Sequence, residues 1–370
     1  MFFPEKSKFL EEMRQKFSEK MNLHTYLIAS EQVNGALAQP FIKIAAQVVE
    51  LERSRVFAGE LAKMSVRNFE YRLNSMILPA FGERLITEIT GEQIHLLYQR
   101  LIAKGLASIS VAQYLQDLKK IFNYAYAHGL VDRIPYFPKV KKTSVPRGGF
   151  TVGEYRQLVI AAKQLSMIKE LSAGITHRNT AGGVYTKTDG IPIEIIWVIR
   201  FMVNGFIRPS DIFHIKHKHV EIVRREYEYL RLKQPETKRH KNQIVTLRPA
   251  VKVYERLKKH MASRNLAGSN DYLFLPEIKD RAIAGRLISQ HFNKVLNAAD
   301  MKQGTLGQQR SLYSLRHTSI MFRLLYGNGI DLLTLARNAR TSVQMIEKFY
   351  ASNLTSEMNI GLIQSRRSMH

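Results

Sequence analysis

The chain has 370 residues, 45% of them hydrophobic and 24% charged, a composition that excludes a mostly disordered or fibrous protein and suffices for two or three domains. The absence of cysteine excludes disulfides, thiolate metal sites and cysteine nucleophiles, and no apolar run approaches the roughly 18 residues of a membrane-spanning helix. The formal net charge is +25, divided as +7 in residues 1–150 and +18 in residues 151–370. A polyanion such as nucleic acid is therefore the expected partner, and a basic protein without a special partner is the alternative.

Residues 1–54 are expected to form an N-terminal helical arm. Apolar residues recur between Phe9 and Phe17 at the spacing of an amphipathic helix, and a second helix is expected through residues 41–46. Residues 1–6 become charged at once and lack the apolar core of a signal peptide. This start favours a cytoplasmic protein.

Residues 55–134 are expected to form a compact helical domain. Thr90 and Gln93 can make a capping box, in which each side chain bonds the backbone amide of the other residue. The apolar stripe that follows predicts a helix, and Gly105 is expected to end it.

Basic residues of the next helix and of the linker after it are candidate DNA contacts. This helix is expected over residues 110–129, with Ser110 as its cap and with Lys119 and Lys120 on its exposed side. Residues 135–150 contain three prolines and two glycines, which predict a linker. Its basic residues would lie along a phosphate backbone, and a solvated surface is the alternative for all of them; they are Lys139, Lys141, Lys142 and Arg147.

Residues 151–354 are expected to form a second domain, mainly helical with a small β-sheet. A helix is expected at its start, and the polar residues 165–190 are expected to form a loop insertion. Alternating and β-branched residues predict two strands, at residues 226–232 and 243–247. Helices resume at Pro249, so the whole chain is expected to be an α+β protein with little sheet.

Residues 205–211 are the first of four candidate functional segments in this domain. Pro209 fits the first position of a helix, and Asp211 would complement the helix dipole in the first turn. Arg208 would then lie at the helix start beside free amides, which makes a good anion site. A surface arginine at a helix cap is the alternative.

The second segment, residues 234–242, lies between the two predicted strands and is expected to be a basic hairpin tip. Its side chains, including Arg239, would reach into DNA, and a lysine held against a phosphate would act as a general acid. Lys238 is preferred for that role, with Lys241 as second choice. A solvated hairpin end is the alternative.

The remaining two segments lie near the end of the domain. Ser314 is expected to cap a helix that carries Arg316 in its first turn, where an arginine beside an apolar helix needs an anionic partner. Thr341 and Gln344 would form a capping box at the start of another helix. Tyr350 would end that helix and project its hydroxyl into a cleft, or would serve only in packing.

The order of these segments resembles the tyrosine recombinase (phage integrase) family, over residues 55 to 355. The family's motifs are matched in turn by Gly205, Arg208 and Asp211, by Tyr313, Arg316, His317 and Thr318, and by the segment that ends in Tyr350. Two positions depart from the common pattern. Tyr313 stands where the family usually has histidine, and Thr341 stands where it usually has histidine or tryptophan.

This resemblance implies a helical core-type DNA-binding domain and a catalytic domain that cleaves and rejoins DNA. Tyr350 would attack a phosphodiester and form a covalent 3′-phosphotyrosyl intermediate. Arg208 and Arg316 would hold the non-bridging oxygens, and Lys238 would protonate the leaving 5′ oxygen. Tyr313 would hydrogen-bond a phosphate oxygen.

The resemblance also implies how the reaction is supported. Asp211 and Thr341 would assist the site, and no metal, other cofactor or ATP would be needed. The expected partners are double-stranded recombination sites, on which four copies assemble through a Holliday junction, and accessory DNA-bending or directionality proteins could join them. The setting would be the bacterial cytoplasm, at the nucleoid, in the service of a mobile genetic element.

Two other functions stay open at this point. An enzyme that relaxes supercoils by the same tyrosyl chemistry would need only one duplex, and a non-catalytic integrase relative would bind DNA without cutting it. Residues 355–370 form a C-terminal tail that contains an apolar cluster between Met358 and Ile363, and the resemblance implies that this tail docks on a neighbouring subunit. A frayed chain end is the alternative for this tail.

Overall fold

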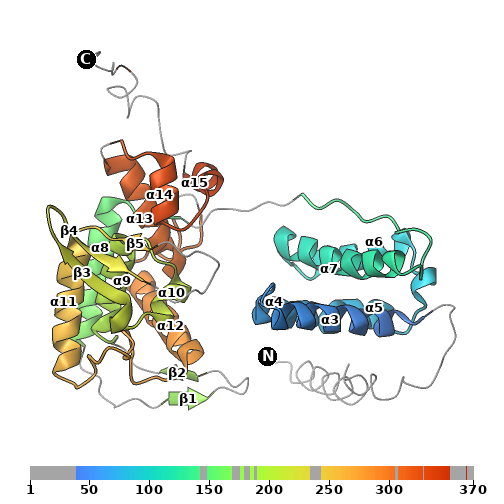
Figure 1. Ribbon diagram of the computed structural model, residues 1–370, viewed down its shortest axis with the longest axis horizontal. Coiled ribbons are helices and arrows are strands. Elements are labelled where there is room, and N and C mark those ends of the chain that lie inside the picture. Colours follow the sequence, from blue (N-terminus) through green and yellow to red (C-terminus); the bar gives the residue numbers. More distant parts are fainter. Residues whose placement is uncertain are drawn as a thin grey trace, which may run out of the picture. The chain divides into compact units, whose positions relative to one another are not determined.

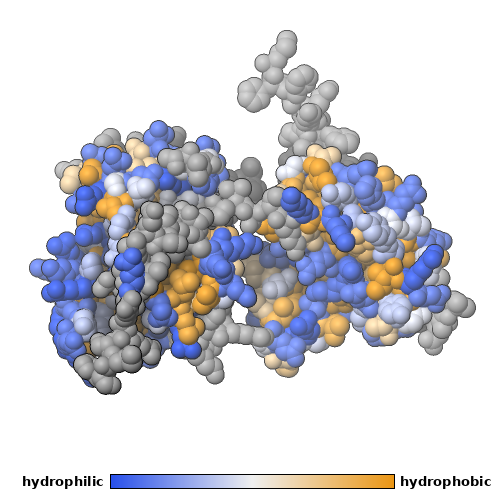
Figure 2. All heavy atoms as spheres, turned by 90° about the horizontal axis from the view of Figure 1, so that it is seen from above, coloured by the Kyte–Doolittle hydropathy of each residue, from blue (hydrophilic) through white to orange (hydrophobic). Residues whose placement is uncertain are grey.

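The computed structural model describes residues 39–141, 148–168, 176–178, 184–186, 190–233, 243–304, 307–327, 329–350 and 364. The chain divides into two compact units, Met1–Ser144 and Val145–His370 (Figure 1). Each unit has its own hydrophobic core, and hydrophilic residues cover much of the face of each unit that Figure 2 shows. Within the described residues, no helix has the length and apolar character needed to cross a membrane.

The first unit is helical throughout its described part. It consists of α3 (Phe41–Phe57), α4 (Lys63–Arg72), the π-helical turn η1 (Leu73–Ile77), α5 (Leu78–Phe81), the 3₁₀ turn η2 (Ile86–Glu88), α6 (Gly91–Ala103) and α7 (Ser108–Ala127). Phe41 of α3 and Phe122 of α7 are both buried and lie 6.4 Å apart between ring centroids. Because α3 shares this core, the packed unit includes residues 41–54, which the sequence analysis assigned to a separate arm.

The helix boundaries of this unit test the capping predictions. Thr90 and Gln93 form the predicted capping box, with bonds of 3.3 and 3.4 Å. Gly105 adopts a left-handed φ of 71° directly after the cap of α6, as predicted. The prediction that Ser110 caps the next helix was wrong. The helix already begins at Ser108, after Ala107, so Ser110 lies within its first turn.

The second unit combines many helices with a small sheet. Its elements are α8 (Val152–Met167), β1 (Thr176–Arg178), β2 (Val184–Thr186), α9 (Glu194–Gly205), α10 (Pro209–His214), the 3₁₀ turn η3 (His217–His219), β3 (Val220–Arg224), β4 (Glu228–Leu232), β5 (Ile244–Val245), α11 (Pro249–Ala262), α12 (Arg281–Ala298), α13 (Leu312–Tyr326), α14 (Leu332–Asn338) and α15 (Val343–Tyr350). The apolar helix α9 lies at the centre, packed against α8, α11 and α13. Figure 1 shows α13, α14 and α15 gathered at one end of this unit.

The main sheet has three antiparallel strands in the order β3-β4-β5. Strands β4 and β5 correspond to the two predicted strands. β3 was missed: its sequence, Val-Glu-Ile-Val-Arg, alternates between apolar and polar residues only over the first three positions. The predicted loop insertion at residues 165–190 also contains the short antiparallel pair β1 and β2. The prediction of a mainly helical chain with a small sheet is confirmed.

Candidate active site

Arg208 lies at the start of α10, as the sequence predicts. It is the N-cap residue, Pro209 is the first helical residue, and the buried carboxylate of Asp211 accepts the Arg208 N–H at 3.2 Å. This bond fixes the backbone from which the arginine side chain projects. The Arg208 side chain donates through Nη2 to the carbonyl of Arg340.

Helix α10 is itself held in place by α12. The carbonyl of Phe213 accepts a hydrogen bond of 2.6 Å from Nε of the buried Arg281. The Phe213 ring packs against Gly285, where a side chain would collide with it. Two residues that hold the helix of Arg208, Arg281 and Gly285, therefore lie 73 and 77 positions after it in the sequence.

Arg316 lies on α13 and is only 2% exposed. It donates through Nη1 to the carbonyl of Phe206 and through Nη2 to the carbonyl of Ala339. Phe206 has a left-handed φ of 55°, which turns the chain sharply after α9. The expected partner of this arginine was an anion, and the structure shows backbone carbonyls in contact with it.

The start of α13 differs from the prediction. Ser311 caps the helix by accepting the Tyr313 N–H at 3.3 Å, and Ser314 is the partner in that capping box. Ser314 therefore does not cap the helix, and Arg316 lies one residue beyond the first turn. The ring of His317 follows and lies 5.1 Å from the ring of Tyr313.

Residues 339–341 connect the two arginines to the last helix. The carbonyls of Ala339 and Arg340 are consecutive and receive Arg316 and Arg208, respectively. Arg340 has a left-handed φ of 51°, and the Thr341 N–H returns to the carbonyl of Ala336 at 2.9 Å. Arg208 and Arg316, called the arginine pair below, thus share one helix end although 108 residues separate them in the sequence.

Helix α15 begins immediately after this turn. Ser342 caps it by accepting the Met345 N–H at 3.2 Å, so the predicted capping box of Thr341 and Gln344 was wrong. Phe349 lies 6.4 Å from His317 between ring centroids, which packs α15 onto the helix of Arg316. Tyr350 is the last residue of α15, and its side chain lies outside the described residues.

The predicted hairpin tip lies outside the described residues, including Lys238, Arg239 and Lys241. The strands that flank it are well defined. Thr246 bonds Leu230 of the neighbouring strand through both its backbone and its hydroxyl, and the Leu247 N–H donates to the carbonyl of Asn204 at 2.9 Å. The base of the hairpin is therefore attached to the end of α9, three residues before Ile207 and four before Arg208.

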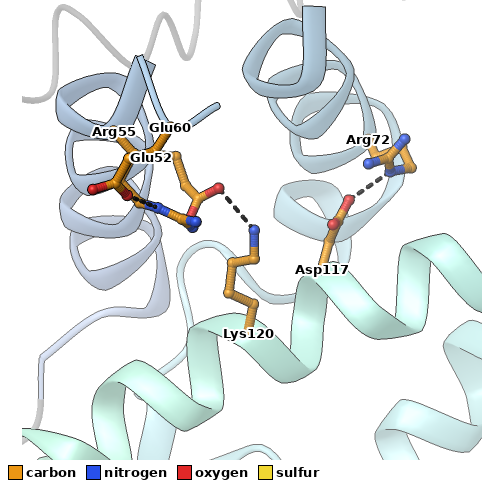
Figure 3. Close-up of polar contacts among 6 residues, drawn as sticks. All are labelled: Glu52, Arg55, Glu60, Arg72, Asp117 and Lys120. Atoms are coloured by element: carbon orange, nitrogen blue, oxygen red, sulfur yellow. Dashed lines mark hydrogen bonds and ion pairs between the residues drawn. The ribbon is translucent and has the colours of Figure 1, made fainter. Parts of the chain in front are cut away.

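The two candidate lysines of α7 lie in different environments. Lys119 is exposed, as predicted. Lys120, which was also expected on the exposed side, is half-buried. Its Nζ lies 3.0 Å from Oε2 of the buried Glu52 (Figure 3) and 4.9 Å from the ring centroid of Phe69. Burial opposes ionisation of Glu52, yet Lys120 and Arg55 outweigh it and lower the pKa of this carboxyl. Lys120 therefore serves the packing of α3 against α7.

A second ion pair lies beside the first. Nε of Arg72 on α4 donates to Oδ2 of Asp117 on α7 at 2.5 Å (Figure 3). Burial raises the pKa of Asp117, and the charge of Arg72 offsets only part of that effect. The two pairs cross-link three helices of the first unit, and the sequence analysis missed both of them.

The linker candidates are described only in part. Lys139 and Lys141 are exposed and lie outside helices and strands, while Lys142 and Arg147 are outside the described residues. At the end of the linker, the buried Phe150 donates its N–H to Oγ1 of Thr318 at 2.9 Å. The linker thus enters the second unit on the helix that carries Arg316.

A stretch of the second unit matches a known protein family. Residues 183–355 match the model of the phage integrase family, a stretch that contains the arginine pair and Tyr350. A search of curated protein sequences finds no significant match.

Solved structures show the same fold. A lambda integrase dimer bound to a core site is 15% identical, with a TM-score of 0.61, and the match covers 84% of this chain and 95% of that one. A lambda integrase tetramer bound to a Holliday junction is 16% identical, with a TM-score of 0.61 and coverage of 90% and 82%. The Tn1549 transposon integrase with circular intermediate DNA is 12% identical, with a TM-score of 0.59 and coverage of 88% and 99%. At these identities the likeness establishes the fold alone.

Proposed function

Because the chain carries a phage integrase family domain within a tyrosine recombinase fold, we propose that it is a site-specific DNA recombinase. The observation that supports this most directly is that both arginines of the arginine pair are held by the same turn after α14. Two guanidinium groups from different helices bond consecutive carbonyls, and α15, which ends in Tyr350, begins three residues later. Such an arrangement suits a single phosphate with a nucleophile beside it.

The proposed reaction is a transesterification at a DNA phosphodiester. The Tyr350 hydroxyl gives its proton to solvent water and attacks phosphorus, the bond to the 5′ oxygen breaks, and a 3′-phosphotyrosyl ester forms. Lys238 gives the departing 5′ oxygen its proton, with Lys241 as second choice. A 5′-hydroxyl of the partner duplex then attacks the ester and releases Tyr350, so the number of ester bonds is conserved and ATP is not consumed.

The arginine pair would stabilise the charge that develops on the non-bridging oxygens. Guanidinium groups remain protonated at all working pH values and offer two parallel donors. Tyr313, whose ring lies against His317 on α13, would donate to one of these oxygens. Asp211 acts indirectly, since it fixes the backbone of Arg208, and Thr341 would support the same turn.

The remaining parts of the proposal concern assembly on DNA. Lys119, Lys139 and Lys141 are exposed and would contact phosphates, together with Lys142, Arg147, Arg239 and Lys241. Four copies would join two recombination sites, and residues 355–370 would dock on a neighbouring copy. The structural relatives include a tetramer on a Holliday junction and a transposon integrase, which supports this assembly and a role in a mobile element.

Covalent trapping tests the proposal. Duplexes that bind the protein are selected from a random pool, and each is nicked close to the candidate cleavage position so that the short 5′-hydroxyl fragment diffuses away. The expected result is a protein–DNA adduct that survives a denaturing gel. Binding without any adduct would indicate a non-catalytic relative. Adducts with relaxation of one supercoiled plasmid, but without strand exchange between two duplexes, would indicate a topoisomerase-like enzyme.

A further inference from the structure

The edge of β5 and the segment that directly follows it are bound to the ends of two helices. The Val245 N–H donates to Oδ1 of Asn338 at 2.8 Å, and Nδ2 of Asn338 donates back to the Val245 carbonyl at 2.9 Å. Two residues further on, the Leu247 N–H donates to the carbonyl of Asn204 at 2.9 Å. Asn338 is the last residue of α14 and Asn204 is the last but one of α9. Residues 245–247, which begin in β5 and continue beyond it, therefore connect these two helix ends.

The same helix ends present the carbonyls that receive the arginine pair. Phe206 directly follows α9 and accepts from Nη1 of Arg316, while Ala339 directly follows α14 and accepts from Nη2. The next carbonyl, that of Arg340, accepts from Arg208. The separation of these acceptors depends on the separation of the two helix ends, which the bonds to Val245 and Leu247 restrain.

We propose that Asn338 is a positioning residue for the arginine pair, an inference that rests on the proposed function. A primary amide carries a donor and an acceptor side by side, so it bonds both backbone groups of Val245 as a neighbouring strand would. Without this amide, the end of α14 can shift against β5, and the arginines shift with the carbonyls that hold them. Misplacement of a catalytic group by about 1 Å can cost about a hundredfold in rate.

The test compares Asn338→Ala and Asn338→Asp with Asn297→Ala in the full-length protein. Asn338→Asp keeps an acceptor for the Val245 N–H but replaces the donor by an oxygen that faces the Val245 carbonyl. Asn297 is exposed near the end of α12, so its variant controls for the loss of an asparagine at a helix C-terminus. The two Asn338 variants should form the adduct about tenfold to a hundredfold more slowly, and Asn297→Ala should match the wild type. Their affinity for DNA should stay within about twofold, because the phosphate contacts that dominate binding remain.

A second substrate separates positioning of the arginines from general loosening of the unit. In a methylphosphonate, a methyl group replaces one non-bridging oxygen of the scissile phosphate, so the reacting group is uncharged and depends less on the arginine pair. Each variant is compared with the wild type on the same substrate. The deficit of Asn338→Ala should shrink to about threefold or less on the methylphosphonate, whereas a loosened unit would be slow on both substrates.

The outcomes distinguish failure of the positioning role from failure of the proposed function. Wild-type rates in both Asn338 variants, or an equal deficit on the two substrates, would overturn the positioning role and leave the proposed function intact. If Asn338→Ala does not fold, Asn338→Asp carries the same comparison, because it preserves the shape of the side chain. A wild-type protein that forms no adduct on either substrate would overturn the proposed function and this inference with it.

Discussion

Gly285 of α12 faces the ring of Phe213 so closely that a Cβ atom at position 285 would lie 2.6 Å from that ring. Phe213 belongs to α10, the helix that begins at Arg208. The contact therefore relates a glycine in one helix to the position of a candidate catalytic arginine in another.

We expect Gly285→Ala to destabilise the second unit and to slow adduct formation. Alanine gains about 1 kcal/mol in helix propensity over glycine, but overpacking typically costs about 1–3 kcal/mol, and the colliding group is an aromatic ring. Thermal unfolding and the adduct assay measure the two effects. Phe213→Leu should relieve the collision in the double variant, and a double variant no better than Gly285→Ala would speak against this explanation.

Tyr350→Phe should abolish adduct formation and leave DNA binding nearly unchanged, because only the nucleophilic oxygen is lost. Gel shifts measure binding, and the nicked substrate measures cleavage. Tyr326→Phe is a matched control, since Tyr326 is an exposed tyrosine at the end of α13. Full adduct formation by Tyr350→Phe would show that another residue is the nucleophile.

Arg316→Lys should slow cleavage by at least about a hundredfold, the usual effect of losing one preorganised donor at a charged transition state. Lysine keeps the charge but cannot reach two carbonyls with a planar fork. Arg337→Lys provides the control, because Arg337 is exposed in the last turn of α14. Single-turnover rates would reveal the difference, and equal rates in the two variants would contradict the proposed role of Arg316.

Replacing Lys139, Lys141 and Lys142 together by alanine should weaken DNA binding and reduce its salt dependence. Each lost phosphate contact lowers the slope of log affinity against log salt by about 0.9, so three contacts would lower it by about 2.7. Lys120→Ala is the informative comparison. Its charge is paired with Glu52, so this variant should change stability and leave the slope unchanged.

Glu52→Gln should lower thermal stability at neutral pH. The pKa of Glu52 is lowered by folding, so its carboxylate contributes stability above the unfolded value near 4.5 and loses it as the pH falls through the folded value. The difference in Tm between wild type and variant should therefore be present at pH 7 and shrink under acid conditions. A difference that grows on acidification would have the wrong sign for this ion pair.

The sequence predicted the fold class because apolar periodicity is strong in the long helices. The capping box at Thr90 was predicted correctly because Thr90 and Gln93 have the side chains and spacing that this motif requires. The predicted capping residue was wrong at two helix starts where more than one hydroxyl residue could serve as the cap. Ser311 caps α13 where Ser314 was expected, and Ser342 caps α15 where Thr341 was expected. Both serines and threonines can cap, so the choice depends on backbone geometry that local sequence does not specify.

The candidate arginines could be identified from the sequence because each lies in a short motif near a helix start, and the motifs follow one another in the order typical of the family. Their partners were not, since the acceptors for Arg316 are backbone carbonyls, one of them 110 residues away. A carbonyl has no sequence signature. Likewise, nothing in the sequence around Asn338 indicates that its amide bonds Val245, 93 residues earlier.

The hydrogen bond from Phe150 to Thr318 has a mechanical consequence. Phe150 is fully buried, and the Arg310 guanidinium lies 4.7 Å from its ring centroid, so the linker is fixed firmly where it enters the second unit. Thr318 is two residues from Arg316 on the same helix. A pull on the linker would therefore act on α13, the helix that carries one of the two candidate catalytic arginines, and not on a compliant surface loop.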